Sequence, residues 1–184
     1  MQATMQIAQA NLAVMAGDSF RPGLEQIFLE HKDLVFRAAY RVTGNASDAE
    51  DVLQTVFLRL VRLEKFPEIA NLPGYLHRSA VNASLDLLRA KKETFSLDED
   101  PNQTEVVSTD HGPHSAELRD WLRYALARLN PRWAEMFVLR FIEDYSNREI
   151  AGIMKTSPAV VAVVLHRTRT QLKKDFKGLT RGTR

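Results

Sequence analysis

Apolar residues recur every three or four positions along most of this chain, which is the repeat expected of one buried face of an α-helix. Such faces cover about residues 22–42, 47–63 and 73–92, and again 115–129 and 131–141. No stretch of any length alternates apolar and polar residues with the period of two that a β-strand requires. The pattern therefore predicts an all-α fold.

Several residues mark where these helices begin and end. Gly44 stands just past the first helix, in the place where a left-handed residue commonly ends a helix. Ser47 and Glu50 have the spacing of a capping box, which predicts that the next helix opens at Ser47. Asn130 and Pro131 predict the cap and the first residue of a later helix.

Residues 145–174 have the pattern of two helices joined by a tight turn. Ser146 and Glu149 form a second predicted capping box at the start of the first helix. After a short polar turn, Ser157 followed by Pro158 predicts the start of the second helix. This second helix has a predicted buried stripe at helical spacing, formed by Val161, Leu165, Thr168 and Leu172.

Basic residues gather on the later turns of this second helix, namely Arg167, Arg169, Lys173 and Lys174. Two short helices with a basic second member describe a helix-turn-helix, whose second helix enters the major groove of DNA. A helical hairpin with a basic surface is also common in soluble all-helical proteins. The pattern alone leaves both interpretations open.

Charge is distributed unevenly along the 184 residues, although the net charge is only +2. Residues 1–92 have 11 Lys/Arg and 10 Asp/Glu, and residues 93–118 have 7 Asp/Glu and no Lys/Arg. Residues 119–184 have 14 Lys/Arg against 6 Asp/Glu, a net +8. A positive surface on this last part would attract phosphate at low salt.

The pattern divides the chain into two small helical domains, residues 21–92 and 115–178. Between them, residues 93–114 lack periodicity and are acidic, which predicts a flexible linker. Residues 1–20 are weakly patterned and predict a poorly ordered segment, and residues 179–184 are a tail.

The composition argues against several other classes of protein. There is no cysteine, so disulfides, thiolate metal sites and cysteine nucleophiles are excluded. No apolar run is long enough to span a bilayer, and the first residues lack the basic start of a signal peptide. We expect a cytoplasmic protein without membrane insertion.

No motif for catalysis is present. His111 and His114 lie close together but have no third ligand nearby, and no glycine-rich phosphate loop or hydrolase motif occurs. Asp48, Glu50 and Asp51 cluster at a helix start, where they favour the helix dipole. We therefore expect no enzyme activity, no metal site and no cofactor.

Two features of the first domain leave alternatives open. Phe66, in the loop 65–73, could pack on the core or stack on a base, and packing is the commoner role. Asn82 has poor propensity for the middle of a helix, so it is either tolerated at the surface or present to make a hydrogen bond. It shares a predicted face with Arg78 and Arg89.

Taken together and in order, these features resemble the extracytoplasmic-function sigma factors of the sigma-70 superfamily. The resemblance covers about Leu24 to Phe176. The segments that support it are SDAEDVLQTVFLRLVR (47–62), YLHRSAVNASLDLLR (75–89), LARLNPRWAEMFVLRFIEDYSNREIAGIM (126–154) and LHRTR (165–169). The resemblance implies a sigma region 2-like bundle and a sigma region 4-like helix-turn-helix domain.

It also implies a function: binding core RNA polymerase and directing it to promoter DNA, with an anti-sigma factor as a further partner. The residues implied for core polymerase binding are Asp48, Glu50, Asp51 and Gln54. Those implied for the minus-10 element, where a flipped base is captured, are Phe66, Arg78, Asn82 and Arg89. Those implied for the minus-35 element are Ala162, Val163, His166, Arg167 and Arg169.

One segment departs from the family pattern, which usually places polar or basic residues just before the LHRTR-like stretch. Here Val160, Val163 and Val164 form surplus apolar surface beside the core stripe. The valines could contact thymine methyl groups, or they could bind a protein such as an anti-sigma factor. Alternatively, minus-35 binding could be weak, with Arg167 and Arg169 holding phosphates.

Two other functions compete with a promoter-specificity subunit. A sigma-like decoy would bind an anti-sigma factor and recognise no promoter, and the apolar second helix is its best support. A conventional regulator would bind duplex DNA without polymerase, which would leave the first domain and the linker without a role. A duplex binder should bind alone with a steep salt dependence, whereas a sigma factor should need core enzyme.

Overall fold

The structure is a computed structural model that describes residues 23–63, 69, 71–95 and 113–182. All regular elements in these ranges are helices, which confirms the all-α prediction with two helical domains. The chain divides into two compact units, residues 1–84 and 85–184, and each is described by itself.

Some sequence predictions lie outside the described part of the chain. The segment 1–20, Phe66 and most of the linker 93–114 belong to this group. The helices that border the linker are α4, which runs through Leu72–Phe95, and α5, which begins at Pro113. The predicted domain limits stay predictions.

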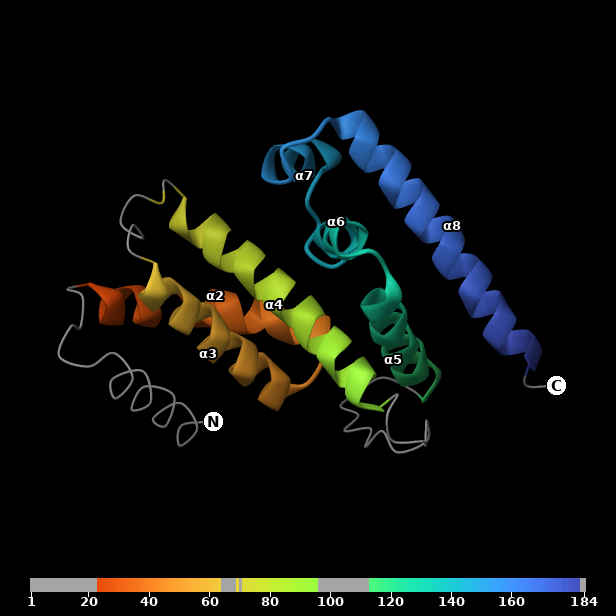
Figure 1. The fold of residues 1–184 in the computed structure, drawn as a ribbon, viewed down its shortest axis with the longest axis horizontal. Coiled ribbons are helices and arrows are strands. Elements are labelled where there is room, and N and C mark those ends of the chain that lie inside the picture. The colour runs from red at the N-terminus through yellow and green to blue at the C-terminus, as the bar shows by residue number, and fades with distance from the viewer. Residues whose placement is uncertain (1–22, 64–68, 70, 96–112, 183–184) are drawn as a thin grey trace. The chain divides into compact units, whose positions relative to one another are not determined.

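The first unit is built on two helices that pack against each other, α2 (Leu24–Thr43) and α3 (Ala46–Arg62) (Figure 1). The buried rings of Phe28 in α2 and Phe57 in α3 meet edge to face, with centroids 4.9 Å apart. The first part of α4 adds further buried apolar side chains to this unit: Leu76, Ala80, Val81 and Ala83.

A sharp reversal joins α2 to α3. Gly44 has a φ of +66° and its N–H donates to the carbonyl of Tyr40, so the predicted role of this glycine is confirmed. The next helix begins at Ala46, because the side chain of Asn45 accepts a hydrogen bond from the backbone N–H of Asp48 at 3.1 Å. The predicted capping box at Ser47 is therefore wrong: Ser47 already lies inside the first turn.

The second unit contains α5 (Pro113–Arg128), α6 (Pro131–Phe141), α7 (Asn147–Ile153) and α8 (Pro158–Gly182). Helices α6, α7 and α8 share one apolar core, made of Met136, Leu139, Ile150, Ala151, Met154, Val161 and Leu165. Farther along α8, Phe176 meets Trp121 of α5 edge to face at 5.0 Å. The backbone of α8 continues to Gly182, past the predicted domain end at 178.

Helix α5 departs from its predicted buried face. The apolar repeat over residues 115–129 predicts that Leu118 is buried on the same face as Ala125, Leu126 and Leu129. The last three are buried, but the side chain of Leu118 is 48% exposed. Among the side chains of α5 that the structure describes, residues 117–128, the buried ones lie toward the C-terminal end, whereas the apolar repeat begins earlier.

Among the described residues, no single helix has the length and apolar character to cross a bilayer. Helices α7 and α8 meet that criterion only when they are taken together across a bend of 106°. In the same ranges, no group of three or more histidine, aspartate or glutamate side chains is placed to hold a metal ion.

Candidate nucleic-acid interface

Helix α7 begins at a complete capping box, as predicted. The backbone N–H of Glu149 donates to the Ser146 hydroxyl at 3.2 Å, and the Ser146 N–H donates to the Glu149 carboxylate at 2.8 Å. The Ser146 hydroxyl also donates to that carboxylate at 2.6 Å. The hydrogen bond from the Ser146 hydroxyl, followed by that from the Ser146 backbone N–H, holds the pKa of the Glu149 carboxyl below its ordinary value, because both favour the charged form.

The turn between α7 and α8 is short and tightly hydrogen-bonded. Lys155 has a φ of +50°, and the N–H of Thr156 donates to the carbonyl of Ala151 at 2.9 Å. Ser157 then caps α8 by accepting a hydrogen bond from the N–H of Val160 at 3.3 Å. The predicted turn and the predicted start of the second helix are both confirmed, and the two helices meet at 106°.

Two arginines of α6 hold the chain at both ends of α7. Arg132 donates from Nη2 to the carbonyl of Met154 at 3.0 Å, just after α7. Arg140 donates from Nη1 to the carbonyl of Tyr145 at 2.9 Å, just before α7. Sequence reasoning missed both arginines, because their partners are backbone atoms that no side-chain pattern reveals.

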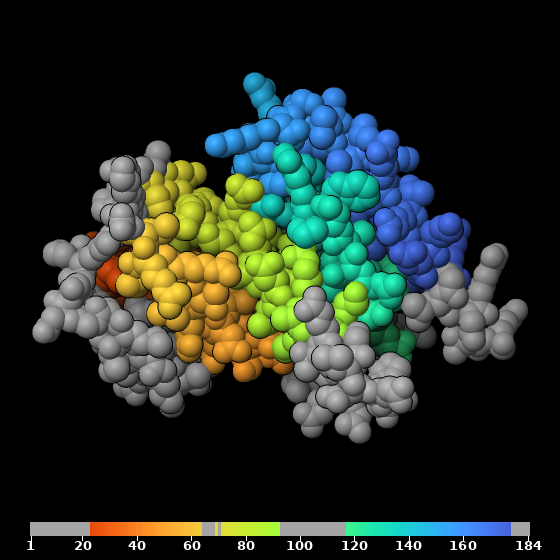
Figure 2. Space-filling model, viewed as in Figure 1, coloured from red at the N-terminus to blue at the C-terminus, as the bar shows by residue number. Residues whose placement is uncertain are grey.

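The core stripe of α8 is confirmed: Val161, Leu165, Thr168 and Leu172 are all buried. Val160 and Val163 are 47% and 49% exposed, so they do form apolar surface outside the core. Val164 differs from the prediction, because it is half-buried and packs against the core cluster. The atoms of α7 and of the described part of α8 are drawn in shades of blue in Figure 2.

All five residues predicted for the minus-35 element lie on exposed positions of α8: Ala162, Val163, His166, Arg167 and Arg169. Three of them line a common hollow of about 500 Å³ that also includes residues of α6 and α7. Its lining is Arg140, Phe141, Asn147, Ala162, Leu165, His166, Arg169, Thr170 and Lys173. The Arg169 guanidinium lies over the ring of Phe141, 5.6 Å from its centroid.

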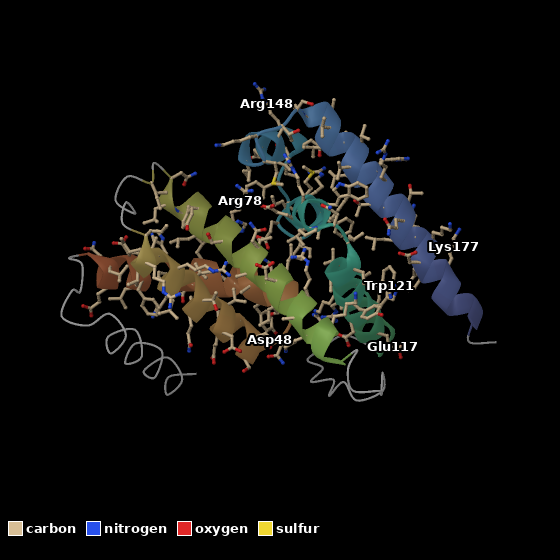
Figure 3. The ribbon with its side chains drawn as sticks, viewed as in Figure 1. Asp48, Arg78, Glu117, Trp121, Arg148 and Lys177 are labelled. Atoms are coloured by element: carbon tan, nitrogen blue, oxygen red, sulfur yellow. The ribbon has the colours of Figure 1, made fainter. Side chains whose placement is uncertain are left out.

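Val163 and Arg167 are absent from the lining of this hollow. Another cation, Arg148, projects from α7 away from the helix and is exposed (Figure 3). The arrangement is therefore a bent pair of helices whose exposed face combines an apolar start with several cations, some of them gathered around one hollow. Such a surface can place cations on a phosphate backbone while a helix contacts base edges.

The residues predicted for the minus-10 element lie on α4 apart from Phe66, which is outside the described residues. Arg78 and Asn82 are half-buried. Arg89 forms an ion pair with Asp86, with Nη1 and Oδ1 2.9 Å apart, so part of its charge is already matched within the helix.

The four residues predicted for core polymerase binding lie in the first turns of α3. Asp51 is exposed, and Glu50 and Gln54 are half-buried. Asp48 is only 8% exposed, so its side chain offers little surface to a partner. The four side chains therefore differ in their exposure to solvent, and Asp51 presents the most accessible charge of the group.

Comparison with known proteins identifies the two helical units. Residues 27–94 match the model of Sigma-70 region 2, and residues 119–172 match that of Sigma-70 region 4. The ECF RNA polymerase sigma factor SigE of Mycolicibacterium smegmatis is 32% identical over 156 residues, which cover 83% of this chain and 61% of that protein. The ECF RNA polymerase sigma factor SigW of Bacillus subtilis is 29% identical over 161 residues, covering 81% of this chain and 86% of its own.

The chain belongs to the extracytoplasmic-function sigma factors of the sigma-70 family. The RNA polymerase sigma factor CarQ of Myxococcus xanthus is a further relative, 28% identical over 159 residues that cover 85% of this chain and 90% of that protein. In this sigma factor, the region 2 match contains α3 and nearly all of α2 and α4. The region 4 match contains α7 and the part of α8 up to Leu172, and thus the capped helix-turn-helix.

Proposed function

We propose that this sigma factor binds core RNA polymerase in the cytoplasm and directs it to promoters, where it assists DNA melting and transcription initiation. The observation that supports this most directly is the presence of both sigma regions on one chain. In region 4, both helices of the helix-turn-helix are capped at their N-termini, α7 by Ser146 and α8 by Ser157. We propose no catalytic step for this chain.

In region 4, the proposed ligand is the minus-35 element as duplex DNA. The support is the exposed face of α8, which has Arg167 and Arg169 on its outer positions and the hollow beside it. Cations at these places would neutralise phosphates and release counterions, which makes binding dependent on salt. Residues 119–184 have a net charge of +8, which favours the approach of DNA.

In region 2, the proposed ligands are the minus-10 element on α4 and the core polymerase at the start of α3. Asn82 is the candidate for hydrogen bonds to the edge of an unstacked base. Arg78 is the candidate for a contact with the phosphate backbone of that DNA strand. Asp51, with Glu50 and Gln54, is the candidate surface for the polymerase. An anti-sigma factor, a partner typical of this family, is proposed as well.

The test is reconstituted transcription. The purified chain and bacterial core RNA polymerase are incubated with fragmented genomic DNA of the source organism, and the 5′ ends of the transcripts are sequenced. Discrete start sites that share two upstream motifs, and that are absent with core enzyme alone, are the expected result. Core binding without discrete starts would favour the decoy, which the names of the relatives do not support. Loss of core binding would reject the proposal.

A charge-reversal pair sharpens this test. Arg169→Glu places a negative charge beside the hollow, and Lys177→Glu makes the same change farther along α8. Promoters that depend on their minus-35 motif should lose most transcription with Arg169→Glu and much less with Lys177→Glu. Equal losses would indicate a general charge effect in place of a local contact.

A further inference from the structure

The first turns of α8 present an apolar surface where a DNA-reading helix would normally offer polar groups. Val160 and Val163 are the third and sixth residues of the helix, and both are about half exposed. Val161 between them is fully buried in the shared core, so the backbone orientation of this segment is set by packing. Val160 and Val163 are therefore held in place, facing away from the core.

Helical spacing defines the line that points most directly away from this core. Ala159, Val163, His166 and Thr170 follow one another at intervals of four, three and four, opposite the buried stripe, and all four are exposed. The line is apolar in its first two turns and polar afterwards. Thr170 directs its hydroxyl back to the carbonyl of His166 at 2.9 Å.

Cations flank this line on both sides. Arg167 and Lys174 lie on one side at helical spacing, and Arg169 and Lys173 lie on the other. A surface that binds a protein through an apolar patch does not require positive charge on both flanks. A helix lying in the major groove does, because a phosphate backbone runs along each edge of that groove. Charge complementarity thus favours duplex DNA as the occupant.

We propose that Val163, together with Val160, reads thymine methyl groups in the minus-35 element. This inference rests on the proposed promoter function and specifies what region 4 recognises. The major-groove pattern that distinguishes base pairs consists of hydrogen-bond donors, hydrogen-bond acceptors and the C5 methyl group of thymine. Valine makes no hydrogen bond, so the thymine methyl is the feature of this pattern that it can contact favourably, whereas a valine placed over a donor or acceptor would leave that group unpaired.

The placement along the helix agrees with this reading. In helix-turn-helix proteins, the N-terminal residues of the second helix contact base edges. Val160 and Val163 occupy those turns, whereas Arg167, Arg169, Lys173 and Lys174 follow later in the helix. The expected minus-35 element therefore contains one or two A·T pairs whose thymine methyls face the valines.

Replacing thymine by deoxyuridine tests this directly, because it removes only the methyl group and keeps base pairing. The sequence of the minus-35 element is first identified from the motifs that the reconstituted transcription experiment finds upstream of the start sites. Duplex promoters with single deoxyuridines are then titrated with holoenzyme containing the intact chain. At the contacted positions, affinity should fall roughly threefold to fourfold, the amount expected for one buried methyl group. Deoxyuridine in the spacer between the two promoter elements serves as the matched control and should have no effect.

A variant links the effect to the side chain. Val163→Ala holoenzyme should bind the thymine promoter less tightly and should no longer distinguish thymine from deoxyuridine at the position that Val163 contacts. Val163→Thr, which keeps one methyl group, should retain part of the discrimination. Because Val163 is about half exposed, both variants should keep the unfolding midpoint of the parent, which tryptophan fluorescence can verify.

The outcomes separate this inference from the function on which it rests. If discrete starts do not occur with the unmodified chain, the proposed function fails and this inference fails with it. If they occur but every deoxyuridine in the minus-35 element is tolerated, or if the element contains no A·T pair, only the inference is overturned. Normal promoter binding by Val160→Ser/Val163→Ser would also overturn it and would leave a protein partner as the occupant of the patch.

Discussion

The guanidinium of Arg132 donates a hydrogen bond to the backbone carbonyl of Met154 at 3.0 Å, across 22 residues of chain. Met154 follows the last residue of α7, where carbonyl groups have no partner within the helix. The contact therefore fastens the start of α6 to the turn that sets the angle between α7 and α8. We therefore expect this hydrogen bond to help fix the orientation of α8 relative to α7.

Arg132→Met should destabilise region 4 by about 1 kcal/mol. The substitution keeps much of the aliphatic stem but removes a charged donor, and the contact is only partly buried, so the loss falls below that of a fully buried bond. Urea unfolding followed by tryptophan fluorescence measures it, because Trp121 and Trp133 both lie in the second unit. Arg167→Met is the control, since it removes the same charge from an exposed position of α8.

Thr168→Val should stabilise the same region by about 1 kcal/mol. Thr168 is fully buried, and its hydroxyl has no hydrogen-bond partner within the described part of the chain. Valine has nearly the same shape and removes the polar atom that is costly to bury. Thr170→Val, at an exposed position of the same helix, should change the unfolding free energy by less than about 0.5 kcal/mol. A destabilised Thr168→Val protein would show that the hydroxyl does find a partner.

The start of α3 distinguishes two candidate caps. Asn45→Ala should destabilise region 2 by about 1 kcal/mol, because its side chain accepts the hydrogen bond from the Asp48 N–H. Ser47→Ala should have little effect, because Ser47 lies within the first turn and is exposed. Hydrogen exchange of the amides in residues 46–62, read by mass spectrometry, can compare the two. Faster exchange in Ser47→Ala than in Asn45→Ala would reverse the assignment.

This pair of residues shows where sequence reasoning succeeds and where it stops. Asparagine and serine are both good caps, and they lie two positions apart, so local preference does not choose between them. The choice follows from the left-handed Gly44, which turns the chain immediately before Asn45. The buried stripe from Val161 to Leu172 was predictable in full, because it depends only on helical spacing along one face of a single helix.

The candidate site was less accessible to prediction wherever tertiary contacts decide. Arg132 and Arg140 bind backbone carbonyls, which no residue pattern encodes. Val164 was counted as surplus surface, but it packs against the core. Leu118 fits the apolar repeat of α5, yet it remains exposed because the packing begins farther along the helix. In each case the missing information was which neighbouring element lies opposite the side chain.

The capping box of α7 should make the stability of region 4 depend on pH. The pKa of Glu149 is lowered in the folded chain, so its contribution is fully present above the ordinary glutamate pKa of about 4.3. That contribution is lost as pH falls through the lowered value. The Glu149→Gln variant should therefore be less stable than the parent at neutral pH, and the difference should shrink toward zero in acid. Urea midpoints read by tryptophan fluorescence at several pH values test this.

Ser146→Ala provides the matching control for that profile. Without the hydroxyl, Glu149 loses the hydrogen bond that contributes most to its lowered pKa. The pH dependence of the variant should therefore be weaker than that of the parent over the same range. A parent and a Glu149→Gln protein that differ by a constant amount at every pH would contradict the account, because the carboxylate would then have no special role in the cap.

Arg169→Met should change how binding depends on salt more than which base is preferred. Arg169 lies over Phe141 at the edge of the hollow, a position suited to one phosphate. Losing one phosphate contact should reduce the slope of log affinity against log salt by about 0.9, equally for thymine and deoxyuridine promoters. Val163→Ala should do the reverse, keeping the slope and losing the discrimination. If Arg169→Met keeps the parental slope in holoenzyme titrations, its guanidinium does not contact the backbone, and the hollow is not a phosphate site.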